Sequence, residues 1–200
     1  MGRFSDGATV ARLDRAFFDR PTVAVARDLL GATLRVAGRA VRIVETEAYV
    51  ADDPASHAFR GPTARNRSMF GPPGTLYVYR IHQVVCANLV THRGEAVLLR
   101  AGEPLSEDLE NPCGPGRLCR ALGIRLTDDG TSVVSDPRIR VERPRGLRTP
   151  IVSGPRVGIR RATRRRLRFA LVDNPWVSSP RLPARAIRQS RFPRGADRRP

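Results

Sequence analysis

A strand-like segment carries two glutamates and a tyrosine whose spacing could activate a water molecule beside a flat ligand. Side chains along a β-strand alternate between its two faces, so in Val41–Tyr49 the residues Glu45, Glu47 and Tyr49 share one face. Glu47 and Tyr49 then lie together near the end of the strand. A carboxylate next to an aromatic ring suits general-base chemistry beside a stacked ligand. The same pattern also fits an edge strand with salt-bridged glutamates.

Further aromatic and polar side chains follow within the same stretch, 44–100. Tyr77 and Tyr79 alternate in a second strand-like segment, and a histidine, His57, comes eight residues after Tyr49. Each of these signals is common in ordinary sheets and loops. Together they predict a pocket that grips a flat, polar, aromatic molecule.

The net charge indicates a polyanionic partner. The chain has 200 residues and a formal charge of +17, and all 36 of its basic residues are arginine. Such a surface favours polyanions, because phosphate contacts release condensed counterions. Codon bias toward G+C could explain why arginine replaces lysine, but it leaves the large excess of positive charge unexplained. Without lysine, no side-chain amine can form a Schiff base, so an enzyme of this sequence must use water or another nucleophile.

The three cysteines predict neither a disulfide framework nor a metal site. Cys86, Cys113 and Cys119 are odd in number and lack the two-residue spacing of a zinc knuckle. We expect reduced, structural thiols, no metal and no cofactor. We also expect no signal peptide and no membrane association, and a location in the cytoplasm.

The elements that would position these residues form an α+β pattern with antiparallel pairing. A helix is expected at Pro21–Leu30, with a proline in its first turn and Gly31 after its end. A short helix or turn is expected at 63–70 and another short helix at 116–122, with a loop at 52–61. Strands are expected at 32–36, 40–49, 75–81, 84–91, 95–101, 156–159 and 167–172, and a weak strand pair at 133–141. We expect one domain over residues 1–180 and a basic, disordered tail over 181–200.

Several motifs in order resemble the alkyladenine-type DNA-3-methyladenine glycosylases. They are IVETEAY, a single histidine, TARNRSMFGPPGTLYVY, CAN, VLLRAGEPL and GPGRLCRALGI, followed late in the chain by RVGI and NPWVS. The resemblance runs from about Leu13 to Ser178. It implies a single-domain α+β fold with a DNA-inserting β-hairpin that acts on duplex DNA. We expect a monomer, because a minor-groove wedge needs only one copy. The implied activity is excision of a flipped, alkylated or deaminated purine in base excision repair, with the protein at the bacterial nucleoid during repair.

The resemblance also implies a role for each matching residue. Glu47 would be the general base for the attacking water, which Arg100 and the main-chain carbonyl of Val157 would help to hold. The pocket would be lined by Tyr49, His57 and Tyr79, and Asn88 would exclude normal guanine by crowding its exocyclic amino group. Arg65 and Arg67, in an Arg-Asn-Arg triplet, would either support the loop or contact DNA phosphates.

The sequence departs from the family pattern at the expected hairpin tip. The family places a tyrosine there, in a Tyr-Gly pair, as the wedge that fills the gap left by the flipped nucleotide. Here the tip reads Ile81-His82-Gln83, and the stretch to Asn88 is one residue shorter. We expect His82 to replace the wedge, although it could merely cap a turn. Two classes stay open: a monofunctional glycosylase without a lyase step, and a non-catalytic binder of distorted or damaged DNA.

Overall fold

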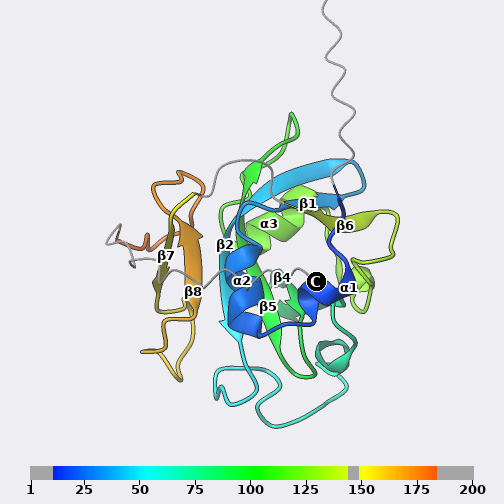
Figure 1. Ribbon diagram of the computed structural model, residues 1–200, viewed down its shortest axis with the longest axis vertical. Coiled ribbons are helices and arrows are strands. Elements are labelled where there is room, and N and C mark those ends of the chain that lie inside the picture. The colour runs from blue at the N-terminus through cyan, green and yellow to red at the C-terminus, as the bar shows by residue number, and fades with distance from the viewer. Residues whose placement is uncertain (1–10, 144–148, 184–200) are drawn as a thin grey trace, which may run out of the picture.

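The computed structural model describes residues 11–143 and 149–183. Most of the structure is an eight-stranded antiparallel sheet, with short helices packed against it (Figure 1). Its strands are β1 (Thr33–Val36), β2 (Arg39–Tyr49), β3 (Leu76–Ile81), β4 (Val84–Val90), β5 (Ala96–Pro104), β6 (Ile139–Glu142), β7 (Ile151–Gly154) and β8 (Arg168–Leu171). The helices are α1 (Arg15–Phe18), α2 (Thr22–Asp28) and α3 (Pro115–Leu122), with 3-10 turns at η1 (Arg67–Phe70) and η2 (Leu126–Asp128). The α+β prediction is confirmed.

The long strand β2 is the centre of the sheet. The strand order is β3-β4-β5-β2-β1-β6. Strand β8 also pairs with β2, at residues that follow those paired with β1, and β7 pairs with β8. The first residues of β2 therefore pair with β1, whereas Glu45, Thr46 and Glu47 pair with β8. Along its other edge β2 pairs with β5. The segment that carries the two glutamates is thus enclosed by strands on both sides, which excludes the edge-strand interpretation.

Local sequence explains how the hairpins and helices end. The β1–β2 hairpin turns at Ala37 and Gly38, both with positive φ (46° and 89°), which is the backbone that two-residue hairpin turns require. Helix α3 has proline at its start and ends at Gly123, which is left-handed (φ 74°).

Helix α2 covers the face of the sheet opposite the glutamates. Thr46, which points away from Glu45 and Glu47, donates from its hydroxyl to the Ala26 carbonyl of this helix at 2.7 Å. A core of buried aliphatic side chains fills the space between helices and sheet, and Leu29, Val44 and Leu99 are among its fully buried members. Helix α2 therefore covers one face of β2 and leaves Glu45 and Glu47 on the opposite face.

Two predicted strands are wrong. Residues 156–159 form an irregular, bent loop rather than a strand, and the strand that pairs with β8 is β7, a few residues earlier. Of the strand pair predicted at 133–141, only β6 exists as a strand. The short helix α1 and the turn η2 were not predicted. Most of the predicted basic tail, residues 184–200, lies outside the described residues.

Among the described residues, no helix is long and apolar enough to span a bilayer.

Candidate active site

The strand register brings most of the candidate residues to one face of the sheet. Glu47 pairs with Leu98 on β5, Leu98 pairs with Asn88 on β4, and Asn88 pairs with Tyr77 on β3. Directly paired residues point to the same face, and so do residues two apart on one strand. Tyr49 and Tyr79 therefore belong to the same face. The long strand β2 and the three consecutive strands β3, β4 and β5 thus build one polar and aromatic surface.

Glu45 holds the centre of this face together. The side chain is fully buried, and its Oε1 accepts from Arg100 Nε at 3.1 Å and from Arg168 Nε at 2.5 Å. Its other oxygen accepts from the Ser178 main-chain amide at 2.7 Å. Because all of these groups are buried, Glu45 is an ion-paired structural acid that fixes the position of Arg100.

Glu47, two residues later, is also fully buried but is held differently. Its Oε1 accepts from the Val157 main-chain amide at 2.9 Å and lies 3.3 Å from Nη1 of Arg100. Within residues 11–143 and 149–183, its Oε2 accepts only from the Tyr49 hydroxyl, at 3.0 Å. The structure therefore places the amide of Val157, not its carbonyl, against the acid. A water contact from that carbonyl stays a prediction.

The surroundings of Glu47 act on its pKa in opposite directions. Burial raises the pKa above that of an ordinary glutamate, and Glu45 adds to this effect, whereas Arg100, the Val157 amide and the Tyr49 hydroxyl lower it. Burial is the largest of these effects, so the net shift is upward. A carboxylate with a raised pKa is a stronger base once ionised. The pKa of Tyr49 is raised as well, mainly by burial, so its hydroxyl stays protonated and donates to Glu47.

Three aromatic side chains line a hollow beside this face. The His57 ring lies 4.4 Å from the Tyr79 ring in an edge-to-face arrangement, and the Tyr77 and Tyr79 rings lie 5.4 Å apart. His57 Nδ1 and the Tyr77 hydroxyl are hydrogen-bonded at 3.0 Å, and partial burial lowers the pKa of His57. The hollow has a volume of about 280 Å³ and is lined by His57, Thr63, Arg65, Asn66, Tyr77, Tyr79, Arg80 and Ile81.

The hollow does not reach Glu47 or Tyr49, which are absent from its lining. Tyr49 and Tyr79 nevertheless pack against one common cluster of buried side chains, which includes Met69 and Val90. The acid therefore does not line the hollow, and its direct aromatic neighbour is Tyr49.

Two buried asparagines fix the backbone around the hollow through hydrogen bonds. Asn66, the middle residue of the Arg-Asn-Arg triplet, is buried and donates from Nδ2 to the His57 and Gly61 carbonyls at 2.9 and 3.1 Å. Its flanking residues, Arg65 and Arg67, are exposed. Support of the loop thus comes from Asn66, which sequence reasoning missed. Asn88 is buried and donates to the Tyr77 carbonyl at 3.0 Å, so its amide is fixed within the β3–β4 pair.

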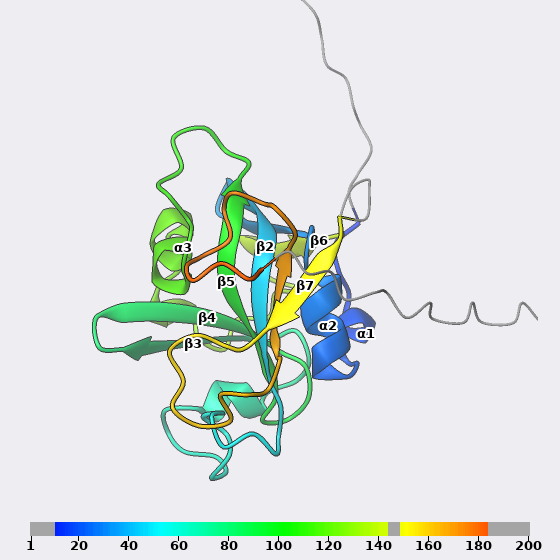
Figure 2. The same ribbon diagram turned by 90° about the vertical axis from the view of Figure 1, so that its left-hand side faces the viewer.

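His82 occupies the tip of the hairpin formed by β3 and β4. Figure 2 shows this hairpin projecting from the body of the molecule. His82 is exposed and has a positive φ of 52°, and its neighbours Ile81 and Val84 are exposed apolar residues (48% and 41%). The hairpin tip therefore presents an exposed imidazole between two exposed apolar side chains.

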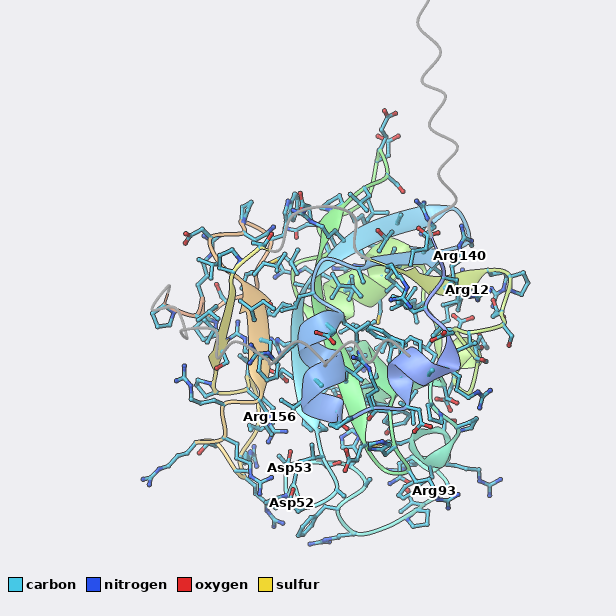
Figure 3. The ribbon with its side chains drawn as sticks, in the orientation of Figure 1. Arg12, Asp52, Asp53, Arg93, Arg140 and Arg156 are labelled. Carbon is cyan, nitrogen blue, oxygen red and sulfur yellow. The ribbon has the colours of Figure 1, made fainter. Side chains whose placement is uncertain are left out.

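A buried ion pair, which sequence reasoning missed, joins two loops next to the acid. Arg156 Nη1 donates to a carboxylate oxygen of Asp53 and, at 2.9 Å, to the Ala48 carbonyl. Figure 3 shows Arg156 reaching toward Asp53, beside Asp52. The same arginine lies over the Tyr49 ring, 4.5 Å from its centroid. This pair holds the loop that supplies the Val157 amide.

The described residues contain no cluster of three or more histidine, cysteine, aspartate or glutamate side chains that could hold a metal ion. All three cysteines are free thiols, with Cys86 and Cys119 buried.

Comparison with known proteins gives one consistent result. A sequence model of the family described as Methylpurine-DNA glycosylase (MPG) matches residues 16–175. A protein of Rhizobium etli is 44% identical over 188 residues, which cover 87% of this chain and 92% of the relative. One of Anaeromyxobacter dehalogenans is 47% identical over 189 residues (88% and 90%), and one of Methanoculleus marisnigri is 44% identical over 188 residues (83% and 98%). Each of the three carries the name "Putative 3-methyladenine DNA glycosylase".

Proposed function

The chain belongs to the methylpurine-DNA glycosylase family and is a hydrolase that acts on N-glycosidic bonds in DNA; we propose that it excises damaged purines from duplex DNA by a water that Glu47 activates. The observation that carries this proposal is the setting of Glu47. It is a fully buried acid with a raised pKa, held by donors from β2, β5 and the loop after β7, beside an aromatic ring.

The first step is binding of the duplex. The net charge of +17 would attract the phosphate backbone, and the exposed Arg65 and Arg67 would contact it. The exposed tip of the β3–β4 hairpin would enter the base stack, with His82 filling the space of the extruded nucleotide. Ile81 and Val84 on either side would cover apolar base edges, as wedge residues do in other proteins that distort DNA.

The second step is capture of the extruded purine. His57, Tyr79 and Tyr49 offer ring faces for stacking, and a cationic alkylated base is attracted by electron-rich rings. The hollow lined by His57 and Tyr79 is the entrance, and the base would move past it to reach Tyr49. Asn88, fixed by the Tyr77 carbonyl, would present its rigid amide against the exocyclic amino group of guanine.

The third step is hydrolysis. Ionised Glu47 accepts a proton from water, whose oxygen forms a bond to C1′ of the deoxyribose. The bond from C1′ to the purine nitrogen breaks, and its electron pair leaves with the base. Negative charge on Glu47 also stabilises the positive charge that develops on the sugar. Arg100 is held by Glu45 and lies 3.3 Å from Glu47, so it is positioned to orient both the acid and the water.

The product would be an abasic site in an uncut strand. The chain has no lysine, so no side-chain amine can form the Schiff base that a lyase step requires. One copy is enough for a hairpin that enters DNA from one side, so we propose a monomer, at work in the cytoplasm where the nucleoid lies.

The test is an excision assay on duplex oligonucleotides that carry one alkylated or deaminated purine. We expect strand breaks only after heating in alkali, which cleaves at abasic sites. Breaks without alkali would contradict the absence of a lyase step. Equal rates on single-stranded and duplex substrates would contradict a mechanism in which the hairpin replaces a flipped base.

A further inference from the structure

The Arg156–Asp53 pair lies directly behind one ring of the proposed base site. Both side chains are fully buried, and the guanidinium carbon of Arg156 is 4.5 Å from the Tyr49 ring centroid. Asp53 follows β2 by four residues, whereas Arg156 belongs to the loop after β7. A fixed positive charge and its counterion are thus placed on one face of Tyr49.

The arginine is held incompletely. Its Nη1 donates to Asp53 and to the Ala48 carbonyl, but Nε and Nη2 are buried and have no hydrogen-bond partner among the described residues. Burying a cation and leaving two of its nitrogens without acceptors is costly, and such an arrangement is not needed merely to join two loops. The ring of Tyr49 is the group that compensates the guanidinium, through its electron-rich face.

A lesion stacked on the other face of Tyr49 would share this ring with Arg156. Damaged purines fall into two electrostatic classes: alkylation of a ring nitrogen gives a cation, whereas deamination gives a neutral base. A cationic base would be repelled by an uncompensated Arg156 and not by a neutral ion pair. A neutral base would be affected little in either case.

We propose that Asp53 and Arg156 determine how the site discriminates between cationic and neutral purines, because Asp53 cancels the charge that Arg156 places behind Tyr49. This inference rests on the proposed role of Tyr49 as a stacking face. It assigns to two buried residues, neither of which touches the lesion, a role in substrate selection. They are positioning residues that act through Tyr49.

The size of the effect follows from the geometry. A base stacked at ordinary contact distance adds about 3.5 Å to the 4.5 Å between Arg156 and the ring, so the two cations would lie roughly 8 Å apart. With an effective dielectric constant of about 20, repulsion at that separation corresponds to a change of about 10- to 30-fold in affinity. Removal of Asp53 should therefore shift the selectivity by roughly ten-fold.

The experiment measures binding in a Glu47→Gln background, where the lesion is expected to survive. Dissociation constants are determined for duplexes that carry either 7-methylguanine, which is cationic, or hypoxanthine, which is neutral. Asp53→Asn leaves Arg156 uncompensated and should lower the preference for 7-methylguanine about ten-fold. Arg156→Gln leaves Asp53 uncompensated and should shift the preference in the opposite direction. The double variant should restore the parental ratio.

Asp52 supplies the matched control. It is the neighbouring aspartate and pairs with Arg165 at 2.8 Å on the surface, so Asp52→Asn should leave the ratio unchanged. A purely structural role would weaken binding to both duplexes equally, in every variant, and would overturn the proposal. Equal shifts in the same direction for Asp53→Asn and Arg156→Gln would overturn it too. If the proposed function itself is wrong, the result is a different one: the Glu47→Gln protein would still excise the damaged base.

Discussion

Replacement of Glu45 by glutamine should strongly lower the free energy of unfolding, although Glu45 is only two positions from Glu47, the proposed base. The carboxylate accepts from Arg100, Arg168 and the Ser178 amide, and all of these groups are buried. Glutamine keeps the size and loses the charge. Arg100 would retain Glu47 at 3.3 Å, but Arg168 would face no carboxylate within the described residues.

The expected cost is that of breaking a buried ion pair, about 3–5 kcal/mol. For a protein of this size each kcal/mol lowers the melting temperature by about 2–4 °C, so the midpoint should fall by roughly 6–20 °C. Urea unfolding followed by circular dichroism measures the free energy, and a thermal scan measures the midpoint. The slope of the urea transition should stay unchanged.

Glu103→Gln is the control for this measurement. Glu103 pairs with Arg42 near the surface and is 29% exposed, so its loss should cost about 0–1 kcal/mol. A cost below about 1 kcal/mol for Glu45→Gln would refute the structural role of Glu45. It would also reopen the question of which of the two acids is the base.

Three further predictions concern pH, the hairpin tip and salt. Because burial raises the pKa of Glu47 and only the ionised form accepts a proton, excision rates should fall as the pH drops through a value above that of an ordinary glutamate. The folded state then binds this proton more readily than the unfolded state, so the stabilising contribution of protonated Glu47 is lost as the pH rises through the raised pKa. Glu47→Gln should therefore be more stable than the wild type at pH 7, by a margin that shrinks toward acid pH in urea titrations. His82→Ala should slow single-turnover excision while His82→Tyr preserves it, and equal rates in all three proteins would remove His82 from flipping. Affinity for duplex DNA should weaken steeply as the salt concentration rises, and a flat response would show that the charge excess is not a DNA-binding surface.

Sequence patterns were enough to predict the elements whose hydrogen bonds join residues close together in the sequence. The β1–β2 hairpin was predictable because its turn needs positive φ and the sequence supplies Gly38. Alternation along β2 placed Glu47 and Tyr49 on one face, and their hydrogen bond follows from that spacing. The strand prediction at 156–159 was wrong because this backbone pairs with no strand in the described part of the chain: the Val157 amide donates to Glu47 instead.

Contacts between residues far apart in the sequence could not be predicted from such patterns. Arg156 and Asp53 are 103 residues apart, and Arg168 and Glu45 are 123 apart, so no spacing rule relates them. Both arginines sit among many exposed ones in an arginine-rich chain, where composition cannot mark the buried few. The sequence therefore indicated an acid beside rings, and the structure was needed to separate the ion-paired Glu45 from Glu47.

The most direct test of the account is the single-turnover excision rate of Glu47→Gln on a duplex with one alkylated purine, compared with Glu103→Gln. General-base assistance is typically worth about 10²- to 10⁴-fold, so we expect a loss of at least that size in Glu47→Gln, with DNA binding retained. Glu103→Gln should excise at the wild-type rate. A Glu47→Gln protein that folds, binds and excises at the wild-type rate would contradict the mechanism.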